Sequence, residues 1–178
     1  MKVLVLGLHR RPSGKCASAG RTYCLRTLRP AGAPLLSYIY TSGTWVHGDS
    51  RTEVFTDTTP VLHSVDIVAW RPAIEQLVLR STKINGIVVR SAVLYGRTAT
   101  IFGLLFKSAA EGKFICPGTP GGRYALVHTD DLADLYVRMA EKASLLGGKI
   151  LLGATGASFL CALSSPSCSL MRRPMLTP

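Results

Sequence analysis

Short apolar runs alternate with helix-like stretches through the middle of the chain, and this alternation predicts the fold class. Each apolar run is near-continuous and ends in glycine or a polar residue, which is typical of a buried strand. Strands are expected at residues 1–7, 35–40, 86–90, 123–127 and 149–152. Because helical segments separate several of these runs, we expect an α/β protein with a parallel sheet.

Three helices are expected. Apolar positions recur near a helical spacing within residues 65–83, and Pro72 places the start of that helix at about Arg71, because proline is tolerated in a first turn. Residues 130–142 carry an apolar stripe with acids at the amino end, where the helix dipole favours negative charge. The third helix is expected at residues 98–111.

The chain is expected to form a single domain over residues 1–152. With 178 residues and 47% hydrophobic positions, it can bury one core. Residues 7–35 have no apolar period and contain several glycine and proline breakers, so an irregular segment is expected there. Residues 153–178 mix Ser, Pro, Cys and Arg without a period, which indicates a disordered or irregular tail.

The net charge of +11 does not indicate nucleic-acid binding once its distribution is considered. Residues 1–35 and 144–178 carry seven and three basic residues and no acid, whereas residues 36–143 carry eleven basic and ten acidic residues. A nucleic-acid domain would show basic clusters with interleaved aromatic residues on its folded face. We therefore expect no nucleic-acid partner. Since no apolar run is long enough to span a bilayer, we expect no membrane partner either.

The five cysteines indicate reduced thiols. Their number is odd and their spacings fit no zinc pattern, which favours an intracellular protein, and we expect a cytoplasmic location. The arginine-rich, acid-free start of the chain leaves an organelle transit peptide open as an alternative.

The segment YTSGTWVHGD at residues 40–49 is the first candidate site. Ser42 or Thr44 could hold a reacting hydroxyl or carbonyl group, or a cofactor ribose, because small hydroxyls at a strand end can donate into a cleft. Ligands of open α/β sheets bind at that end of the strands. The alternative is a glycine-containing turn whose hydroxyls satisfy nearby backbone groups.

Further short motifs follow this segment along the chain. After TSG come EQLV at 75–78, VVR and YG within 88–96, and VHTDDLA at 127–133. In this combination, residues 36–152 resemble the NAD(P)-dependent epimerase/dehydratase family, the extended short-chain dehydrogenases. The resemblance implies a Rossmann-like parallel sheet with flanking helices and a bound NAD or NADP. It also implies oxidation or reduction of a hydroxyl or carbonyl group on a small-molecule or nucleotide-sugar substrate, and it favours a homodimer.

The resemblance assigns roles in catalysis and substrate binding. Ser42 and Thr44 would be the catalytic residues and would position the reacting oxygen. Tyr95 and Arg97 would contact the substrate, and Arg97 would suit an anionic group on it. As a lone arginine, Arg97 is equally consistent with an ordinary surface position.

The resemblance also assigns residues to the cofactor. Those that would bind NAD or NADP are Gly7, Thr41, Arg71, Ser91, Ala92 and Val93. Arg71 would hold the nicotinamide ribose, and the backbone of the last three would meet the nicotinamide. No metal site is expected, because His128 with the two acids after it is better interpreted as a helix cap.

The chain departs from the resembled family at its catalytic pair. The family carries Tyr-x-x-x-Lys, with the lysine four residues before the Glu of a segment like EQLV, and those positions here hold Ile67 and Arg71. A phenol with a pKa of about 10 needs a neighbouring cation to exchange a proton, and isoleucine has no proton to exchange. Another acid, Tyr40, Tyr95 or His47, would have to serve, or the protein would bind without catalysing.

The phosphate-binding start of the family is also incomplete. The family's first strand runs into G-x-x-G-x-x-G, whereas MKVLVLG is followed here by LHRRPSGK, and the run to Leu35 is too short for the remaining strands and helices. We infer that most of the N-terminal half of the dinucleotide-binding fold is missing or replaced. Besides an active enzyme, the alternatives are a non-catalytic dinucleotide-binding regulator and a truncated, inactive family member.

Overall fold

The computed structural model describes residues 3–7, 32–50, 52–97, 103, 107, 110–112, 123–156 and 158–160. In these ranges, no helix has both the length and the apolar character that crossing a lipid bilayer requires. Of the helix expected at 98–111, residues 103, 107 and 110 are helical, and most of the others lie outside the described ranges. Most of the segments expected to be irregular, residues 8–31 and 161–178, also lie outside them.

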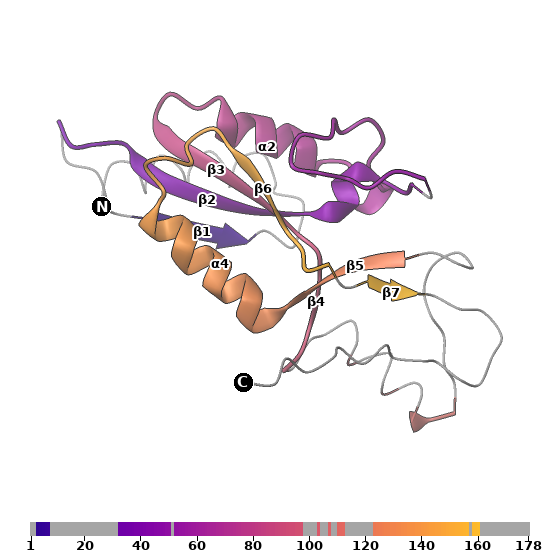
Figure 1. Ribbon diagram of the computed structural model, residues 1–178. Helices are drawn as coiled ribbons and strands as arrows, with labels where there is room; N and C mark the ends of the chain where they lie inside the picture. Colours follow the sequence, from indigo (N-terminus) through magenta and orange to yellow (C-terminus); the bar gives the residue numbers. More distant parts are fainter. Residues whose placement is uncertain are drawn as a thin grey trace.

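A four-stranded parallel sheet forms the centre of the molecule (Figure 1). Its strands lie in the order β1 (Val3–Gly7), β2 (Leu36–Gly43), β3 (Ile84–Ser91) and β6 (Ile150–Gly153). Every neighbouring pair is parallel. The α/β class with a parallel sheet, predicted from the alternation of apolar and helical segments, is confirmed.

Strand β2 is longer than the sequence predicts. Thr41, Ser42 and Gly43 remain paired with β3, so these small residues belong to the strand itself and not to a turn. The 3-10 turn η1 (Thr44–His47) follows directly. Pairing with a buried neighbouring strand compensates for the low strand preference of glycine, and the sequence of the segment alone does not reveal this partner.

Three short strands form a second sheet, below and to the right of the first in Figure 1. Strand β4 (Val93–Tyr95) is parallel to β5 (Arg123–His128), and β7 (Ser158–Leu160) pairs antiparallel with β5. The prediction of an irregular tail from residue 153 is therefore wrong at Ser158–Leu160. A strand of three residues carries too little pattern to be predicted, and its pairing with β5 supplies the hydrogen bonds that stabilise it.

Helices α2 and α4 cover opposite faces of the main sheet. Helix α2 (Arg71–Leu79) lies above the sheet in Figure 1, and α4 (Thr129–Glu141) lies below it. As predicted, α2 begins at Arg71 with Pro72 in its first turn, although it ends at Leu79 and not at residue 83. The short 3-10 turn η2 (Asp66–Val68) precedes it.

His128 caps helix α4. Its Nδ1 accepts a hydrogen bond from the backbone N–H of Asp130 at 3.2 Å, and Asp130 and Asp131 occupy the first turn. The interpretation of these residues as a helix cap with acids at the positive end of the dipole is confirmed. Within the described residues, no group of three or more His, Cys, Asp or Glu side chains could hold a metal ion.

Two hydrophobic clusters hold the helices on the sheet. Successive strand residues point to opposite faces of the sheet, so successive residues of β2 and β3 belong to different clusters. The α4-side cluster contains Ile39, Ile87, Val89, Ala92, Val127, Leu132, Met139 and Ala143. The α2-side cluster contains Tyr40, Val78, Ile84 and Val88. Burying one large aliphatic side chain contributes about 1.5–3 kcal/mol, so the two clusters fix both helices against the sheet.

The segment between η1 and η2 reaches the outer edge of the main sheet. Strand β6 is the last strand in the described sheet order. Beside it, Asp57 Oδ1 accepts a hydrogen bond from the backbone N–H of Leu152 at 2.7 Å. Hydroxyl groups of Thr56, Thr58 and Thr59 hold the turn that carries Asp57. The carboxylate therefore takes the place that the carbonyl group of a further strand would have.

The variant Gly86→Ala tests the close packing of α2 on β3. A Cβ at Gly86 would overlap the backbone carbonyl of Val78 in α2, so the helix must shift, and we expect the free energy of unfolding to fall by about 1–3 kcal/mol. Urea denaturation measures this change. Gly156→Ala is the matched control, because its Cβ position has open space around it. An equal loss in both variants would contradict the packing described here.

Candidate functional site

The carboxyl ends of the parallel strands form one edge made of small residues. The register aligns Gly43 of β2 with Ser91 of β3, and Ser91 with Gly153 of β6. Gly7, the last residue of β1, aligns with Thr41. We call these five residues the carboxyl edge. Ligands of open α/β sheets bind outside such an edge, and small side chains leave room for a ligand to approach the backbone.

Ser42 lies directly behind the carboxyl edge with its hydroxyl buried. The residue is 1% exposed, and it aligns with Arg90 of β3 on the α2 side of the sheet. Its Oγ has no hydrogen-bond partner among the described residues. Thr44, the other candidate catalytic residue, is half-buried in η1. Ser42 and Thr44 therefore lie two residues apart, at the end of β2 and the start of η1.

Thr41 faces the opposite side of the sheet and is bound by α4. Its Oγ1 lies 2.5 Å from the phenolic oxygen of Tyr136. Burial raises the pKa of the Tyr136 phenol, which keeps it protonated at neutral pH. This contact ties α4 to the carboxyl edge beside Gly7.

A buried charged cluster lies beneath α2, next to Ser42. Arg90 of β3 and Glu75 of α2 are 3% and 1% exposed. Arg90 Nη2 donates to Glu75 Oε2 at 2.7 Å, and Nε lies 3.3 and 3.2 Å from Oε1 and Oε2. His47 of η1 is 6% exposed, with its Nε2 3.0 Å from Arg90 Nη1. The Glu75–Arg90–His47 cluster thus joins a strand, a helix and a turn around the carboxyl edge.

The contact with Arg90 determines the protonation state of His47. A guanidinium group has only donors, so His47 Nε2 must accept, and the ring proton must be on Nδ1. Burial, followed by the charge of Arg90, lowers the pKa of His47 and keeps the imidazole neutral at neutral pH. The ring of Phe55 stacks on the imidazole with 4.8 Å between centroids. His47 therefore belongs to the interior.

Arg71 lies over the end of β2. A Cβ at Gly43 would come 3.0 Å from Arg71 Nη1, so the glycine leaves the space that the guanidinium occupies. The guanidinium carbon also lies 5.5 Å from the ring centroid of Trp70, a cation–π contact. As the first residue of α2, Arg71 brings its charge to the carboxyl edge.

The three alternative acids named from the sequence have surroundings that do not favour proton exchange with a substrate. Tyr40 is fully buried, and burial raises its pKa to about 12. His47 is held in the buried cluster. Tyr95 lies on the second sheet and meets the ring of His128 edge-on, with 5.1 Å between centroids. Ile67, at the tyrosine position of the resembled family, is 70% exposed.

Strand β3 passes almost directly into β4 through Ala92. Ala92 is 3% exposed and packs in the α4-side cluster, and its backbone N–H donates to the carbonyl of Gly153 at 2.8 Å. Ser91 and Val93 flank it at half-buried positions, and Ser91 Oγ donates to the carbonyl of Ser42 at 3.4 Å. The backbone of Ser91–Val93 therefore borders the carboxyl edge, although the amide of Ala92 is already bound.

The two candidate substrate residues lie beyond the carboxyl edge, at the start of α4. Arg97 Nε donates to Asp130 Oδ1 at 2.6 Å, and both side chains are exposed. The carbonyl of Tyr95 accepts a hydrogen bond from Thr129 Oγ1 at 3.0 Å. The structure therefore places Tyr95 and Arg97 with helix α4 and the second sheet, apart from Ser42.

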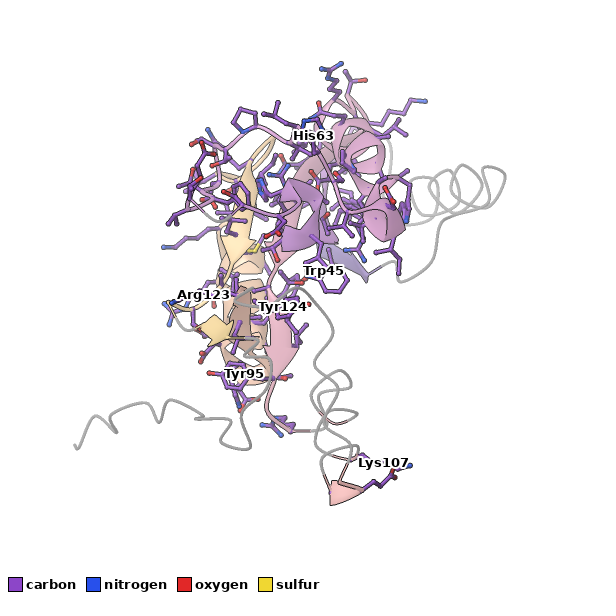
Figure 2. The ribbon with its side chains drawn as sticks, turned by 90° about the vertical axis from the view of Figure 1, so that its right-hand side faces the viewer. Trp45, His63, Tyr95, Lys107, Arg123 and Tyr124 are labelled. Carbon is purple, nitrogen blue, oxygen red and sulfur yellow. The ribbon has the colours of Figure 1, made fainter. Side chains whose placement is uncertain are left out.

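An aromatic pair connects the two sheets. The rings of Trp45 in η1 and Tyr124 in β5 are tilted by 43°, with 6.4 Å between centroids. Figure 2 shows Trp45, Tyr124 and Tyr95 in that order down the molecule. This pair is not predicted from the sequence, because the two residues are far apart along the chain and no local pattern links them.

The buried pair of Glu75 and Arg90 is also not predicted from the sequence. A signal was present, because Glu75 lies one helical turn from Val78 on the apolar face of α2, and Arg90 lies next to the last residue of a buried apolar strand. Charged residues are rarely buried without a partner. Opposite charges at two positions predicted to be buried therefore indicate an ion pair.

No protein-family model matches the chain, and no curated protein matches it. Solved structures, in contrast, share its fold. A dTDP-glucose 4,6-dehydratase from Bacillus anthracis str. Ames, in complex with NAD, matches 86% of this chain and 52% of its own length, with a TM-score of 0.65 and 17% identity. A UDP-N-acetylglucosamine 4-epimerase from Bacillus cereus matches 89% and 59%, with a TM-score of 0.61 and 12% identity.

A third structure is the UDP-glucuronic acid 4-epimerase from Bacillus cereus in complex with UDP-glucuronic acid and NAD. It matches 78% of this chain and 44% of its own, with a TM-score of 0.59 and 18% identity. The chain thus spans about half the length of these enzymes. The expected Rossmann-like fold, and the resemblance in fold to the NAD(P)-dependent epimerase/dehydratase family, are shown.

The pH dependence of stability tests the neutral state of His47. Its pKa in the folded protein lies below the unfolded value of about 6.5, so the unfolded chain binds the proton more tightly. The stabilisation is complete above about pH 6.5 and decreases as the pH falls toward the folded pKa. Urea denaturation should show that His47→Gln, which can accept from Arg90 but does not titrate, loses less stability on acidification than the wild type.

The control for this comparison is His63→Gln, since His63 is exposed. This variant should keep the slope of the wild type, because the exposed side chain of His63 lies outside the buried cluster. Equal slopes for the wild type and His47→Gln would contradict the neutral, buried state of His47.

The variant Glu75→Gln tests the buried ion pair. Without the carboxylate, the charge of Arg90 stays buried and uncompensated, and we expect a loss of about 3–5 kcal/mol in the free energy of unfolding. Chemical denaturation measures the loss. Glu141→Gln, at an exposed position of α4, should change stability by no more than about 0.5 kcal/mol. A loss in Glu75→Gln as small as that of the control would show that the ion pair is not needed.

Proposed function

We propose that the chain binds NAD or NADP at its carboxyl edge and acts on a hydroxyl or carbonyl group of a small-molecule or nucleotide-sugar substrate. The observation that supports this most directly is the aligned row of Gly43, Ser91 and Gly153 at the ends of parallel strands, with the Ser42 hydroxyl buried behind it. The dehydratase and the UDP-glucuronic acid epimerase of the same fold were solved with NAD.

The residues of the edge fit the nicotinamide half of such a cofactor. Gly43 carries no side chain where Arg71 approaches, and the planar guanidinium can donate to ribose or phosphate oxygens. The backbone of Ser91 and Val93 borders the same edge. When bound, the nicotinamide would supply hydride transfer.

Ser42 and Thr44 would hold the reacting oxygen of the substrate. A serine or threonine hydroxyl both donates and accepts, so it can bind either an alcohol or a carbonyl group. Tyr95 and Arg97 would reach only a part of the substrate that extends toward α4, where Arg97 is already paired with Asp130. The cytoplasmic location and the homodimer remain part of this proposal.

A second candidate function is dinucleotide binding without catalysis. It is favoured by the surroundings of the phenols, since Ile67 stands at the tyrosine position and Tyr40 is buried with its pKa raised to about 12. A guanidinium such as that of Arg71 does not lose its proton in proteins, so it can hold a ligand but cannot act as the acid or base. Such a protein would bind the dinucleotide as a regulator and would not convert a substrate.

Isothermal titration calorimetry with NAD+ and NADP+ tests the proposal. We expect binding, and we expect Arg71→Ala to weaken it about tenfold, because hydrogen bonds from a charged donor are lost. Arg80→Ala, at the other end of α2, is the matched control and should bind as the wild type does. Turnover of aldehydes, followed by NADH absorbance, and of nucleotide sugars, followed by chromatography of the products, separates the enzyme from the non-catalytic protein. Chromatography is needed because an epimerisation leaves NAD unchanged overall. An absence of binding to both dinucleotides would contradict both functions.

A further inference from the structure

Hydrogen-bond donors without acceptors gather on the α2 side of β2. Tyr40 and Ser42 occupy alternate positions of the strand and therefore share one face. Both are buried, and neither side-chain oxygen has a hydrogen-bond partner among the described residues. Nδ1 of the buried His47 is a third atom of this kind. Because buried polar groups are normally satisfied, water or a ligand is expected beside them.

Each of these three atoms carries a hydrogen that it can donate in a hydrogen bond. The contact of Arg90 with Nε2 places the ring proton of His47 on Nδ1. The hydroxyl of Ser42 can rotate to donate. Burial raises the pKa of Tyr40 to about 12, so its phenol is protonated at neutral pH. The missing partner of all three is therefore an acceptor.

The contacts of neighbouring residues bring the donors together. Ser42 lies directly across from Arg90, and paired strands are about 4.8 Å apart. Arg90 in turn contacts His47. Arg71 lies over the end of the same strand, because its Nη1 would come 3.0 Å from a Cβ at Gly43. Ser42, His47 and Arg71 thus lie near the end of β2, and Tyr40 lies two residues before Ser42 on the same face of the strand.

The first turn of α2 adds positive potential at this place. It consists of Arg71, Pro72 and Ala73, and the side chain of the N-cap residue, Trp70, makes no capping hydrogen bond. The amino end of a helix carries a partial positive charge and binds anions. The buried carboxylate nearby, Glu75, is already bound by Arg90 through three contacts. An anionic acceptor from outside the chain fits these surroundings.

We propose that Tyr40, Ser42, His47 and Arg71 bind an oxygen of a phosphate or carboxylate group beneath the first turn of α2. We call them the donor set. An oxyanion offers acceptors only, and hydrogen bonds to a charged acceptor are stronger than those to a neutral one. The inference rests on the proposed function in so far as both use Ser42 and Arg71, and it deepens that function by giving the ligand an anionic group next to its reacting part.

Inorganic phosphate and acetate serve as probes, because they separate the two sources of an oxyanion. We expect the melting temperature to rise with the concentration of at least one of them and to saturate, relative to chloride at the same ionic strength. A rise with phosphate alone assigns a phosphate-bearing ligand, and a rise with acetate assigns a carboxylate. Because phosphate also stabilises proteins non-specifically, the decisive quantity is the difference between the wild type and variants of the donor set.

Tyr40→Phe is the most specific variant, because it removes only the hydroxyl that has no hydrogen-bond partner among the described residues. Without anions, its melting temperature should equal or exceed that of the wild type, since an unsatisfied buried group is lost. Its apparent dissociation constant for the anion should rise about tenfold, the effect of losing one hydrogen bond to a charged group. A purely structural role of Tyr40 would lower the melting temperature in every buffer.

Ser42→Ala and Arg71→Gln should weaken anion binding in the same way, and Arg80→Gln at the exposed end of α2 should not. If neither anion raises the melting temperature more than chloride, or if the rise is the same in Tyr40→Phe and Ser42→Ala as in the wild type, the donor set holds water and the inference is wrong.

Calorimetry with NAD+ separates the failure of this inference from that of the proposed function. Anion binding that depends on Tyr40 and Ser42, in a protein that binds neither NAD+ nor NADP+, would support the donor set and contradict the proposed function. Dinucleotide binding without any specific effect of phosphate or acetate would support the proposed function and overturn the donor set.

Discussion

The ion pair between Arg90 and Glu75 is the interaction on which the geometry of the carboxyl edge depends. Both charges are buried, so each is tolerated only while the other is in place, and the pair therefore holds α2 at one position over β3. Through the contact with His47, the same guanidinium fixes the turn that follows β2. One arginine thus sets where the strand end, the helix start and the turn lie relative to each other, and a shift of α2 would move Arg71 as well.

The fold can be predicted from local patterns in the sequence, whereas the geometry of the site depends on contacts between distant residues. Pro72 marks the start of α2 because its ring fits only a first turn, and the two acids after His128 mark the start of α4. Ser42, in contrast, belongs to a strand because β2 remains paired with β3 at this position. The burial of His47 depends on Arg90, which lies 43 positions further along the chain. No local period encodes partners of this kind.

The carboxyl edge combines the backbone of a Rossmann-like sheet with an unusual set of side chains. The register keeps glycine and serine at the strand ends, which suits close approach of a ligand. Around them, however, the ionisable groups are held in single protonation states: the phenol of Tyr40 protonated, the imidazole of His47 neutral, and the guanidinium groups charged. Such surroundings favour the recognition of a ligand's charge over the transfer of its protons.

The segment that carries Phe55 and Asp57 connects the interior of the molecule with its outer boundary. Phe55 stacks on His47, and two residues later Asp57 binds the backbone of β6. If this segment detached, the imidazole would lose its aromatic neighbour and the last strand of the described sheet would expose unpaired amide groups in the same step. Unpaired strand amides are a template for association with other chains. Loss of order in the site and a tendency to aggregate through the sheet would therefore arise together.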